Sequence, residues 1–327
     1  MSRRALITGI GGQDGSLLAE LLLEQGYEVF GIVRSEPDAY PNLAPIRDQI
    51  QIVEAQLLDQ RSLDAALRLS QPSEVYNLAA PSFVPLSWEQ PVLTAEFAAV
   101  GATALLESVR TAAPEARVYQ AASSEIFGEP LEAPQNEHTP LQPLTPYGAA
   151  KAYSVFIVRS YRRRYDMHAS NGILFNHESP RRPLDFLPRK VAHSAARIAA
   201  GFEETLLLGD LDARRDWGYA GDYVRAMWLM LQQDEPADYV VATGATHSVR
   251  ELAESAFEHV GLDWQAHVRV DEAFKRGKAQ LHNLVGDPAK ARERLGWQPT
   301  IDFDGLVRLL VDADVEALAA AGPAVGP

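Results

Sequence analysis

Short apolar runs alternate with segments of helical periodicity through the first half of the chain. Six runs have the length of buried strands, and they span residues 4–10, 27–33, 49–54, 74–80, 117–121 and 168–175. Four segments repeat apolar residues with the spacing of amphipathic helices, and they span residues 16–25, 62–69, 92–112 and 147–165. Strands that alternate with helices in this order predict an α/β fold built on a doubly wound parallel sheet.

The pattern changes after Phe175. A polar, proline-containing segment over 176–183 is followed by an expected helix over 186–201 and a short strand over 206–208. We therefore expect two domains and a tail. The first domain spans 1–175 with about 219–245, a smaller C-terminal α/β domain spans about 176–218 and 246–318, and the flexible tail spans 319–327.

Composition excludes several kinds of chemistry. The chain of 327 residues has no cysteine, which excludes disulfides, thiolate metal sites and cysteine nucleophiles. Its eight histidines show no metal-ligand spacing, and no metal site is expected. The formal net charge of −14 argues against general nucleic-acid binding. The sequence shows neither an apolar N-terminal signal segment nor an apolar stretch of membrane-spanning length, so we expect a cytoplasmic protein without a membrane partner.

A glycine turn joins the first strand to the first helix. Gly9, Gly12 and Gly15 follow one another at intervals of three, which gives GxxGxxG instead of the standard GxGxxG fingerprint. Glycine here permits a tight turn, close approach of the backbone to a pyrophosphate, and close packing of the helix on the strand. Strand, glycine turn, helix and strand in succession therefore predict a dinucleotide site.

Arg34 stands at the end of the second strand, where an acidic residue would accept the ribose hydroxyls of NAD. A guanidinium group instead suits the 2′-phosphate of NADP, so NADP is the expected cofactor. The alternative is a solvated surface arginine at a strand end.

Tyr147 and Lys151 are four residues apart on a predicted helix, which places them one turn apart on the same face. A nearby ammonium group favours the phenolate and lowers the pKa of a tyrosine, so Tyr147 is a candidate acid and base for a hydroxyl proton. The YxxxK spacing alone also arises by chance, and it needs a cofactor site to carry meaning.

Ser123, Ser124 and Glu125 follow the strand over 117–121. Their side chains are expected at the carboxyl edge of the sheet, where open α/β folds bind ligands. The alternative is that this turn only caps a helix.

Cationic side chains gather after Phe175. Arg189, Lys190, Arg214 and Arg215 together are able to clamp a diphosphate, although each alone is more often a solvated charge or a salt-bridge partner. His177 is expected to contact the cofactor, or a side chain that holds it, and not to act as a general base.

These residues lie in stretches that resemble a known family. The matching stretches are TGIGGQDGSLLAELLLEQGYEVFGIVR, EVYNLAAPSFVP, YQAASSEIFG, PYGAAK, NGILFNHESPRR, LDARRDWGYAGDYVRAMWLMLQQDEPADYVVATGATHSVRE and GDPAKARERLGW. From Ala5 to about Glu316 the chain is similar to the Rossmann-like extended short-chain dehydrogenases/reductases, and it specifically resembles the GDP-mannose 4,6-dehydratase family. The resemblance implies that the first domain binds NADP and the C-terminal domain binds a nucleotide sugar.

The resemblance also implies a reaction. Tyr147 takes the proton of the sugar's 4-hydroxyl as NADP accepts hydride from C4, and Lys151 holds the phenolate and the nicotinamide ribose. Ser123 relays a proton from O4 to Tyr147. Glu125 removes the C5 proton and helps to expel the 6-hydroxyl as water, after which hydride returns to C6.

Two sets of binding residues are implied in the same way. The residues implied to hold NADP are Gly9, Ile10, Gly11, Gly12, Gln13, Asp14, Arg34, Gln56, Leu57, Leu78, Ala79, Ala80, Ser82, Tyr147, Lys151, His177 and Arg182. The residues implied to hold the nucleotide sugar are Ser82, Ser123, Ser124, Glu125, Asn176, Lys190, Arg215 and Arg276.

The chain departs from the family's pattern in places. Ser35 replaces the second of two arginines, and the acidic residue expected near Gln56 is absent. After Arg276, Ala279 and Leu281 stand where the family has acidic residues. A dehydratase or epimerase acting on another nucleotide sugar, such as a GDP-heptose, therefore stays open. A non-catalytic NADP-binding regulator is a remote further alternative.

The expected partners are the nucleotide-sugar substrate and further copies of the chain. The helices over 92–112 and 147–165 match those through which the family dimerises, so a homodimer or homotetramer is implied by the resemblance.

Overall fold

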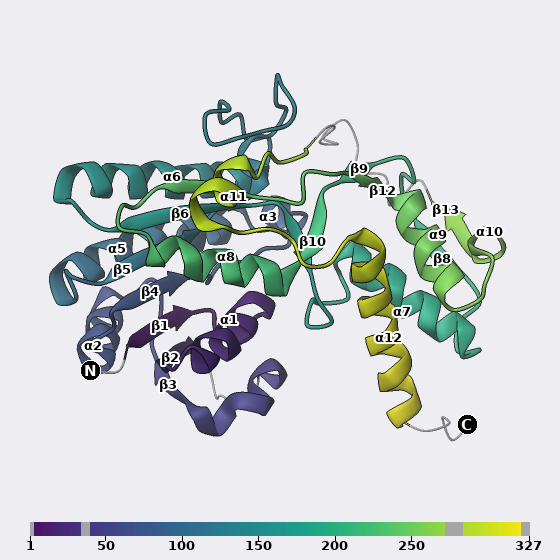
Figure 1. Ribbon diagram of the computed structural model, residues 1–327, viewed down its shortest axis with the longest axis horizontal. Coiled ribbons are helices and arrows are strands. Elements are labelled where there is room, and N and C mark those ends of the chain that lie inside the picture. The colour runs from purple at the N-terminus through teal and green to yellow at the C-terminus, as the bar shows by residue number, and fades with distance from the viewer. Residues whose placement is uncertain (1–2, 34–39, 272–283, 322–327) are drawn as a thin grey trace.

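The computed structural model describes residues 3–33, 40–271 and 284–321. Its centre is a sheet of seven parallel strands in the order β11-β6-β5-β4-β1-β2-β3 (Figure 1). The strands are β1 (Arg4–Thr8), β2 (Glu28–Val33), β3 (Ile50–Glu54), β4 (Glu74–Asn77), β5 (Arg117–Ala121), β6 (Ala169–Leu174) and β11 (Asp238–Val241). Because the strand order runs outward in both directions from β1, the predicted doubly wound sheet is confirmed.

Six of these strands coincide with apolar runs of the sequence. The fourth apolar run spans residues 74–80, but its strand, β4, ends at Asn77. It ends there because the backbone N–H groups of Leu78 and Ala79 donate to the Thr8 hydroxyl and not to a neighbouring strand. The pattern does not predict β11, since this strand has four residues and begins with a charged one.

Helices cover both faces of the sheet. Helices α1 (Gln13–Glu24) and α8 (Ala220–Gln232) share one hydrophobic cluster with the sheet. Helices α2 (Gln60–Ser70), α5 (Gly101–Ala112) and α6 (Pro146–Tyr165) pack on the opposite face. Shorter elements complete this part of the chain: η2 (Pro41–Gln49), α3 (Leu86–Glu89), α4 (Pro91–Ala95), η3 (Glu96–Val100) and η4 (Ser124–Ile126).

The helix from Pro91 to Ala112 corrects one expectation from the sequence. It joins α4, the π-helical η3 and α5, and by length and composition alone it is long and apolar enough to cross a membrane. The expectation that no apolar stretch reaches that length is therefore wrong. The α5 part of this helix packs against α2 and the sheet through Leu105, Leu106 and Val109. Such packing is typical of a helix in the core of a globular protein.

A second hydrophobic cluster lies beside the sheet, at the right of Figure 1. It joins helices α7 (Leu187–Ala199), α9 (Val249–His259) and α12 (Phe303–Ala321) to the strand pair β8 (Leu206–Leu208) and β13 (Val268–Val270). Further elements are β7 (Asn176–Glu178), which pairs with β10 (Trp217–Tyr219), β9 (Arg214–Arg215), which pairs with β12 (His247–Ser248), α10 (Trp264–His267) and α11 (Ala289–Leu295). Helix α12 continues to Ala321, past residue 319, where the sequence places the start of a tail; residues 322–327 lie outside the described residues.

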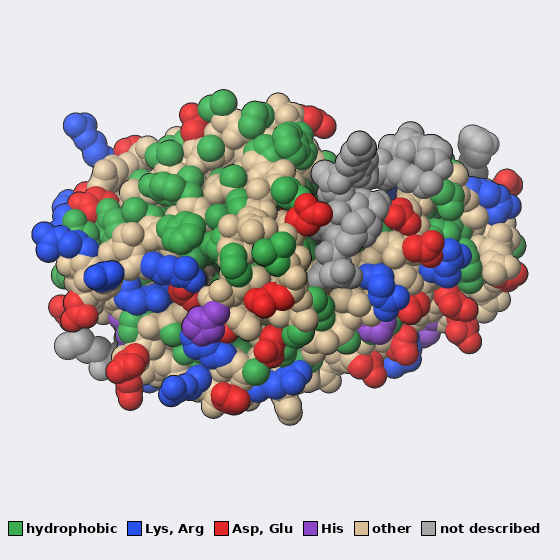
Figure 2. Space-filling view, turned by 90° about the horizontal axis from the view of Figure 1, so that it is seen from above, with side chains coloured by type: hydrophobic (Ala, Val, Ile, Leu, Met, Phe, Trp, Pro, Cys, Tyr) green, Lys and Arg blue, Asp and Glu red, His purple; other side chains and the backbone are tan. Residues whose placement is uncertain are grey.

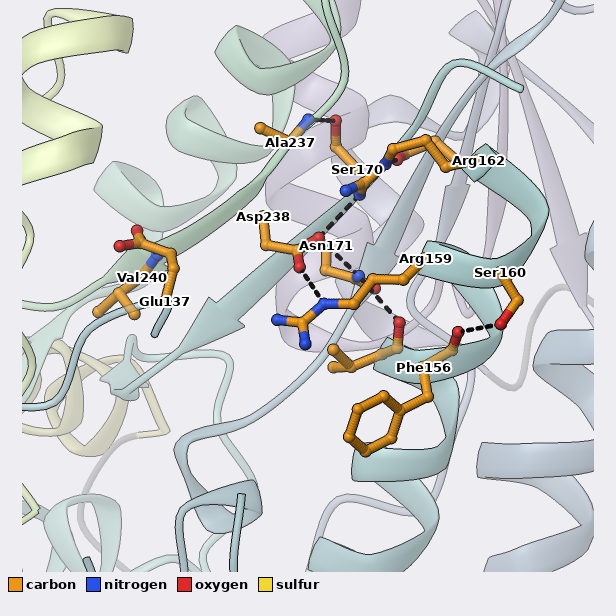
Figure 3. Close-up of polar contacts among 12 residues, drawn as sticks. Glu137, Phe156, Arg159, Ser160, Arg162, Ser170, Asn171, Ala237, Asp238 and Val240 are labelled. Carbon is orange, nitrogen blue, oxygen red and sulfur yellow. Dashed lines mark hydrogen bonds and ion pairs between the residues drawn. The ribbon is translucent and has the colours of Figure 1, made fainter. Parts of the chain in front are cut away.

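Asp238 fixes β11 to the rest of the sheet. Its carboxylate accepts hydrogen bonds from Arg159 Nε at 2.6 Å, Arg162 at 2.7 Å and Asn171 Nδ2 at 2.8 Å (Figure 3). Two residues further on, the backbone N–H of Val240 donates to the Glu137 carboxylate at 2.7 Å. Side chains of α6 and β6 thus hold the strand that the apolar pattern does not predict.

Asp238→Ala should destabilise the fold by about 3 kcal/mol, because it removes the anion from a largely buried ion pair and leaves two arginines without it. Burial opposes ionisation of Asp238, but Arg162 and Arg159 outweigh it and lower its pKa. The stabilisation is therefore present above the ordinary aspartate pKa and lost as pH falls through the lowered one. Denaturant unfolding at neutral and acid pH measures both the loss of stability in Asp238→Ala and its dependence on pH.

Asp212→Ala is the control for this experiment. It breaks an exposed ion pair with Arg250 and should change the free energy of unfolding by less than about 1 kcal/mol.

Candidate active site

A cavity of about 1280 Å³ opens at the carboxyl edge of the sheet. Its walls come from the glycine turn, from the ends of β4, β5 and β6, from α6, and from the segment that leads into α7. The strand order changes direction between β1 and β4, so the cavity lies where open α/β sheets bind ligands.

The glycine turn forms one wall of the cavity, and Gly9 and Gly15 have no room for side chains. Gly9 has a φ of +71°, and the N–H of Gly12 donates to its carbonyl at 3.1 Å. A Cβ on Gly15 would lie 2.3 Å from that same carbonyl oxygen, and one on Gly9 would lie 3.0 Å from the backbone of Ala79. Backbone is therefore exposed to the cavity where helix α1 begins, which fits a dinucleotide's pyrophosphate.

Tyr147 and Lys151 face the cavity from the first turns of α6. The helix begins here because Thr145 caps it, accepting a hydrogen bond from the N–H of Gly148 at 2.9 Å, and because Pro146 suits the first helical position. Lys151 Nζ donates to the Ala121 carbonyl at 2.8 Å and lies 5.7 Å from the centre of the Tyr147 ring.

Burial dominates the protonation of this pair. It raises the pKa of Tyr147 to about 12; the Ser123 hydrogen bond acts in the opposite direction, and the Glu125 carboxylate adds to the increase. Burial also lowers the pKa of Lys151 to about 8. The sequence predicts a lowered pKa for Tyr147, and the structure shows a raised one, since desolvation depends on packing that the spacing does not reveal.

Ser123 and Glu125 line the same cavity as Tyr147. Ser123 caps the 3-10 turn η4 by accepting from the N–H of Glu125 at 3.3 Å, so the capping alternative describes part of its role. Its hydroxyl also acts on Tyr147, since it lowers the pKa of that tyrosine against the effect of burial. A candidate proton acceptor (Tyr147), a candidate relay (Ser123) and a carboxylate (Glu125) therefore line the same cavity.

Asp14 and His177 form an ion pair between the glycine turn and β7. His177 Nε2 lies 2.9 Å from Asp14 Oδ2, and His177 Nδ1 lies 2.7 Å from the Phe175 carbonyl. Burial of His177 disfavours its charge, but Asp14 outweighs burial and raises the pKa of this histidine. The ring also stacks on Tyr223, with centroids 4.6 Å apart.

The remaining wall carries the residues expected to bind the nucleotide sugar. Asn176, Lys190 and Arg215 all line the cavity. Lys190 Nζ donates to the Leu207 carbonyl at 2.9 Å. Arg182, which is expected to hold NADP, also lines the cavity; its Nε lies 3.2 Å from Glu178 Oε2, and its Cζ lies 3.6 Å from the centre of the Phe186 ring.

The cavity brings together most residues that the sequence suggests, but not all. Ile10, Gln56 and Ser124 are not among its lining residues; Ile10 is in the hydrophobic core and Gln56 is exposed. Arg34 and Arg276 lie outside the described residues. Among the described residues, no group of three or more histidines and carboxylates could hold a metal ion.

Several lining residues carry no sequence signal for binding. They are apolar or aromatic and come from loops, from η3 and from β8: Tyr40, Phe83, Phe97, Phe186, Leu207 and Leu208. Tyr40 is the clearest example, because a Cβ on Gly11 would overlap its ring. Only the unusual extra glycine at position 11 hints at that contact.

The fold and the site together define the class of protein. It is an extended short-chain dehydrogenase/reductase, because the doubly wound parallel sheet carries a glycine turn at its switch point and because a tyrosine and a lysine one helical turn apart line the same cavity. A family model described as GDP-mannose 4,6 dehydratase matches residues 6–310. The chain belongs to the GDP-mannose 4,6-dehydratase family, as the resemblance in its motifs indicates.

Individual relatives agree with this assignment. The chain is 46% identical to "GDP-mannose 4,6 dehydratase 1" of Arabidopsis thaliana, over 95% of this chain and 90% of that protein. Among solved structures, dTDP-glucose 4,6-dehydratase from Streptomyces venezuelae, which has NAD bound, is 27% identical with a TM-score of 0.82, over 94% and 95% of the two chains. UDP-glucose 4-epimerase from Thermotoga maritima is 25% identical with a TM-score of 0.84, over 96% and 99%.

Proposed function

We propose that the protein converts GDP-mannose to GDP-4-keto-6-deoxymannose and water, with NADP as its resident cofactor. One observation supports this reaction most strongly: Ser123, Glu125, Tyr147 and Lys151 line the same cavity as the glycine turn. Oxidation of an alcohol requires an acid–base residue beside a dinucleotide, and elimination of water requires a further carboxylate. A simple reductase would have no use for Glu125.

The side chains divide the reaction between them. NADP, held at the glycine turn, would supply the acceptor for a hydride from C4 of the sugar and the donor of a hydride to C6. Tyr147 accepts the proton of the 4-hydroxyl, with Ser123 as its relay. Lys151, as an ammonium group, favours the phenolate form of Tyr147, which is the form that can accept this proton. Glu125 takes the acidified C5 proton and delivers a proton to the departing 6-hydroxyl, so that water leaves and the carboxylate is regenerated.

Mass spectrometry tests the substrate directly. The protein should be incubated with a panel of nucleotide sugars, and loss of water from GDP-mannose is the expected result. Loss of water only from another nucleotide sugar, such as a GDP-heptose, would support the alternative that the altered segment 275–283 favours. Tight NADP binding with no reaction on any sugar would support a regulator.

Replacing Arg34 with alanine should weaken binding of NADP far more than binding of NAD, because only NADP carries the 2′-phosphate that a guanidinium pairs with. Cofactor titration followed by intrinsic fluorescence measures both dissociation constants. Arg47→Ala is a suitable control, since this arginine does not line the cavity. Equal weakening of both cofactors would show that Arg34 does not contact the phosphate.

We also infer that the protein works as a homo-oligomer joined through α6 and the helix that precedes it. Val92, Val100, Tyr153 and Phe156 of these helices are exposed apolar residues. Figure 2 shows hydrophobic side chains over much of the left half of the face seen from above, on the side of α6. An exposed patch of this kind is typical of a protein interface.

A further inference from the structure

We propose that Glu178, together with Phe186, fixes the Arg182 guanidinium group in the cavity so that this group binds a phosphate of a nucleotide ligand. Glu178 is then a positioning residue, because it acts on the ligand only through Arg182. All three side chains line the cavity; they come from β7, from the turn that follows it, and from the residue that precedes α7. The inference rests on the proposed function only for the choice of ligands, NADP and a GDP-sugar, each of which carries a diphosphate.

Glu178 is a buried carboxylate that needs a cation beside it. Only 2% of this residue is exposed, and its Oε2 lies 3.2 Å from Arg182 Nε. A buried charge is costly unless a charge of opposite sign compensates for it. Because the guanidinium group supplies that charge, Glu178 attracts Arg182 to one place in the cavity wall.

Phe186 limits the guanidinium group from a second direction. Arg182 Cζ lies 3.6 Å from the centre of the Phe186 ring, which is a cation–π contact. The ring itself is held edge-on by Phe83, with centroids 5.5 Å apart and an interplanar angle of 71°. Phe83 belongs to the loop after β4 and also lines the cavity. The guanidinium group therefore has a carboxylate at Nε and an anchored ring against one face.

The backbone brings the three side chains together. Glu178, Arg182 and Phe186 follow one another at intervals of four residues. Two turns separate them: the N–H of Arg182 donates to the Ser179 carbonyl at 3.0 Å, and that of Phe186 donates to the Pro183 carbonyl at 3.2 Å. The arrangement is thus built into the path of the chain between β7 and α7.

Arg182 keeps donors for a ligand. Nε and Glu178 Oε2 are both buried without a hydrogen-bond partner among the described residues, so charge and not an aligned hydrogen bond holds this pair. The ring contact covers a face of the guanidinium group, whereas the N–H bonds of its two Nη groups lie in the plane. A guanidinium fork suits phosphate oxygens, and a side chain that is fixed beforehand loses less entropy on binding.

A double-mutant cycle on nucleotide binding tests the proposal. Isothermal titration calorimetry with NADP and, separately, with GDP measures the dissociation constants of the unaltered protein, Arg182→Met, Glu178→Gln and the double variant. Arg182→Met should weaken binding of the nucleotide whose phosphate it holds by about tenfold or more. Glu178→Gln should weaken it by at least about threefold, and the double variant should match Arg182→Met within about twofold.

Glu20→Gln is the matched control. Glu20 pairs with the neighbouring Arg181 at 2.6 Å, and neither residue lines the cavity. This variant should keep both dissociation constants within about twofold of the unaltered protein.

The two nucleotides identify the phosphate. Weaker binding of NADP alone assigns it to the cofactor, and weaker binding of GDP alone assigns it to the nucleotide sugar. Unchanged binding of both nucleotides by Glu178→Gln would overturn the proposal, and so would losses that add in the double variant, since a merely structural role predicts addition. If Glu178→Gln does not fold, Phe186→Leu replaces it in the cycle with the same expected outcome.

Nitrogen-15 NMR of the arginine side chains provides a test that needs no nucleotide. A fixed guanidinium group rotates slowly about its Nε–Cζ bond and shows separate Nη signals, and Arg182→Met identifies those of Arg182. These signals should be separate in the unaltered protein and should merge in Glu178→Gln. Merged signals in the unaltered protein would contradict the proposal. If no nucleotide sugar loses water, the proposed function fails while this NMR result stands, so the two failures are distinguishable.

Discussion

Tyr147→Phe should abolish oxidation at C4, so that GDP-mannose no longer produces enzyme-bound NADPH. The phenylalanine ring fills the same buried site but cannot accept the proton of the 4-hydroxyl, and loss of a general acid–base group typically costs about 10²–10⁴-fold in rate. Stopped-flow absorbance of NADPH during the first turnover measures this step directly. Binding of NADP should persist, since the glycine turn is untouched.

The same helix offers a matched control. Tyr153 lies nearly two turns further along α6, with an exposed ring whose hydroxyl is 3.2 Å from that of Thr103. Tyr153→Phe removes a tyrosine hydroxyl from the same helix outside the cavity, and the first turnover should be unaffected. Wild-type turnover by Tyr147→Phe would remove this tyrosine from the mechanism.

Glu125→Gln should separate the two halves of the reaction. Tyr147, Ser123 and Lys151 are intact in this variant, so oxidation at C4 and the accompanying rise of NADPH should survive. An amide cannot accept the C5 proton, and elimination should slow by about 10²–10⁴-fold. The expected result is trapped NADPH with no dehydrated product, together with loss of solvent deuterium exchange at C5.

Glu129→Gln is the control for that experiment, because Glu129 is exposed, four residues away, and does not line the cavity. It should form product at the normal rate. Dehydrated product from Glu125→Gln at the unaltered rate would place the C5 base on another residue.

The sequence predicts those parts of the molecule that depend on local spacing. The buried strand Arg117–Ala121 is found with the predicted bounds, and the glycine turn and the Tyr147–Lys151 pair lie where the motifs place them. Apolar runs and helical intervals report on the backbone within a few residues, and these features need nothing more.

Features that depend on distant parts of the chain could not be predicted in this way. Asp14 and His177 are 163 residues apart, and only the fold brings their side chains together. The raised pKa of Tyr147 has the same origin, because the spacing to Lys151 indicates an attraction but gives no measure of burial. Strand β11 is held by Arg159 and Arg162 of α6, contacts that no local pattern contains.

Strand β11 ends the sheet on one side, and an end strand with free backbone groups can recruit a strand from another molecule. Here that edge is already occupied. The Glu137 carboxylate accepts from the Val240 N–H, and Lys290 Nζ donates to the Asp238 carbonyl at 2.7 Å. A charged side chain thus stands where the backbone of an incoming strand would bind, so growth into a continuous intermolecular sheet is blocked at this end.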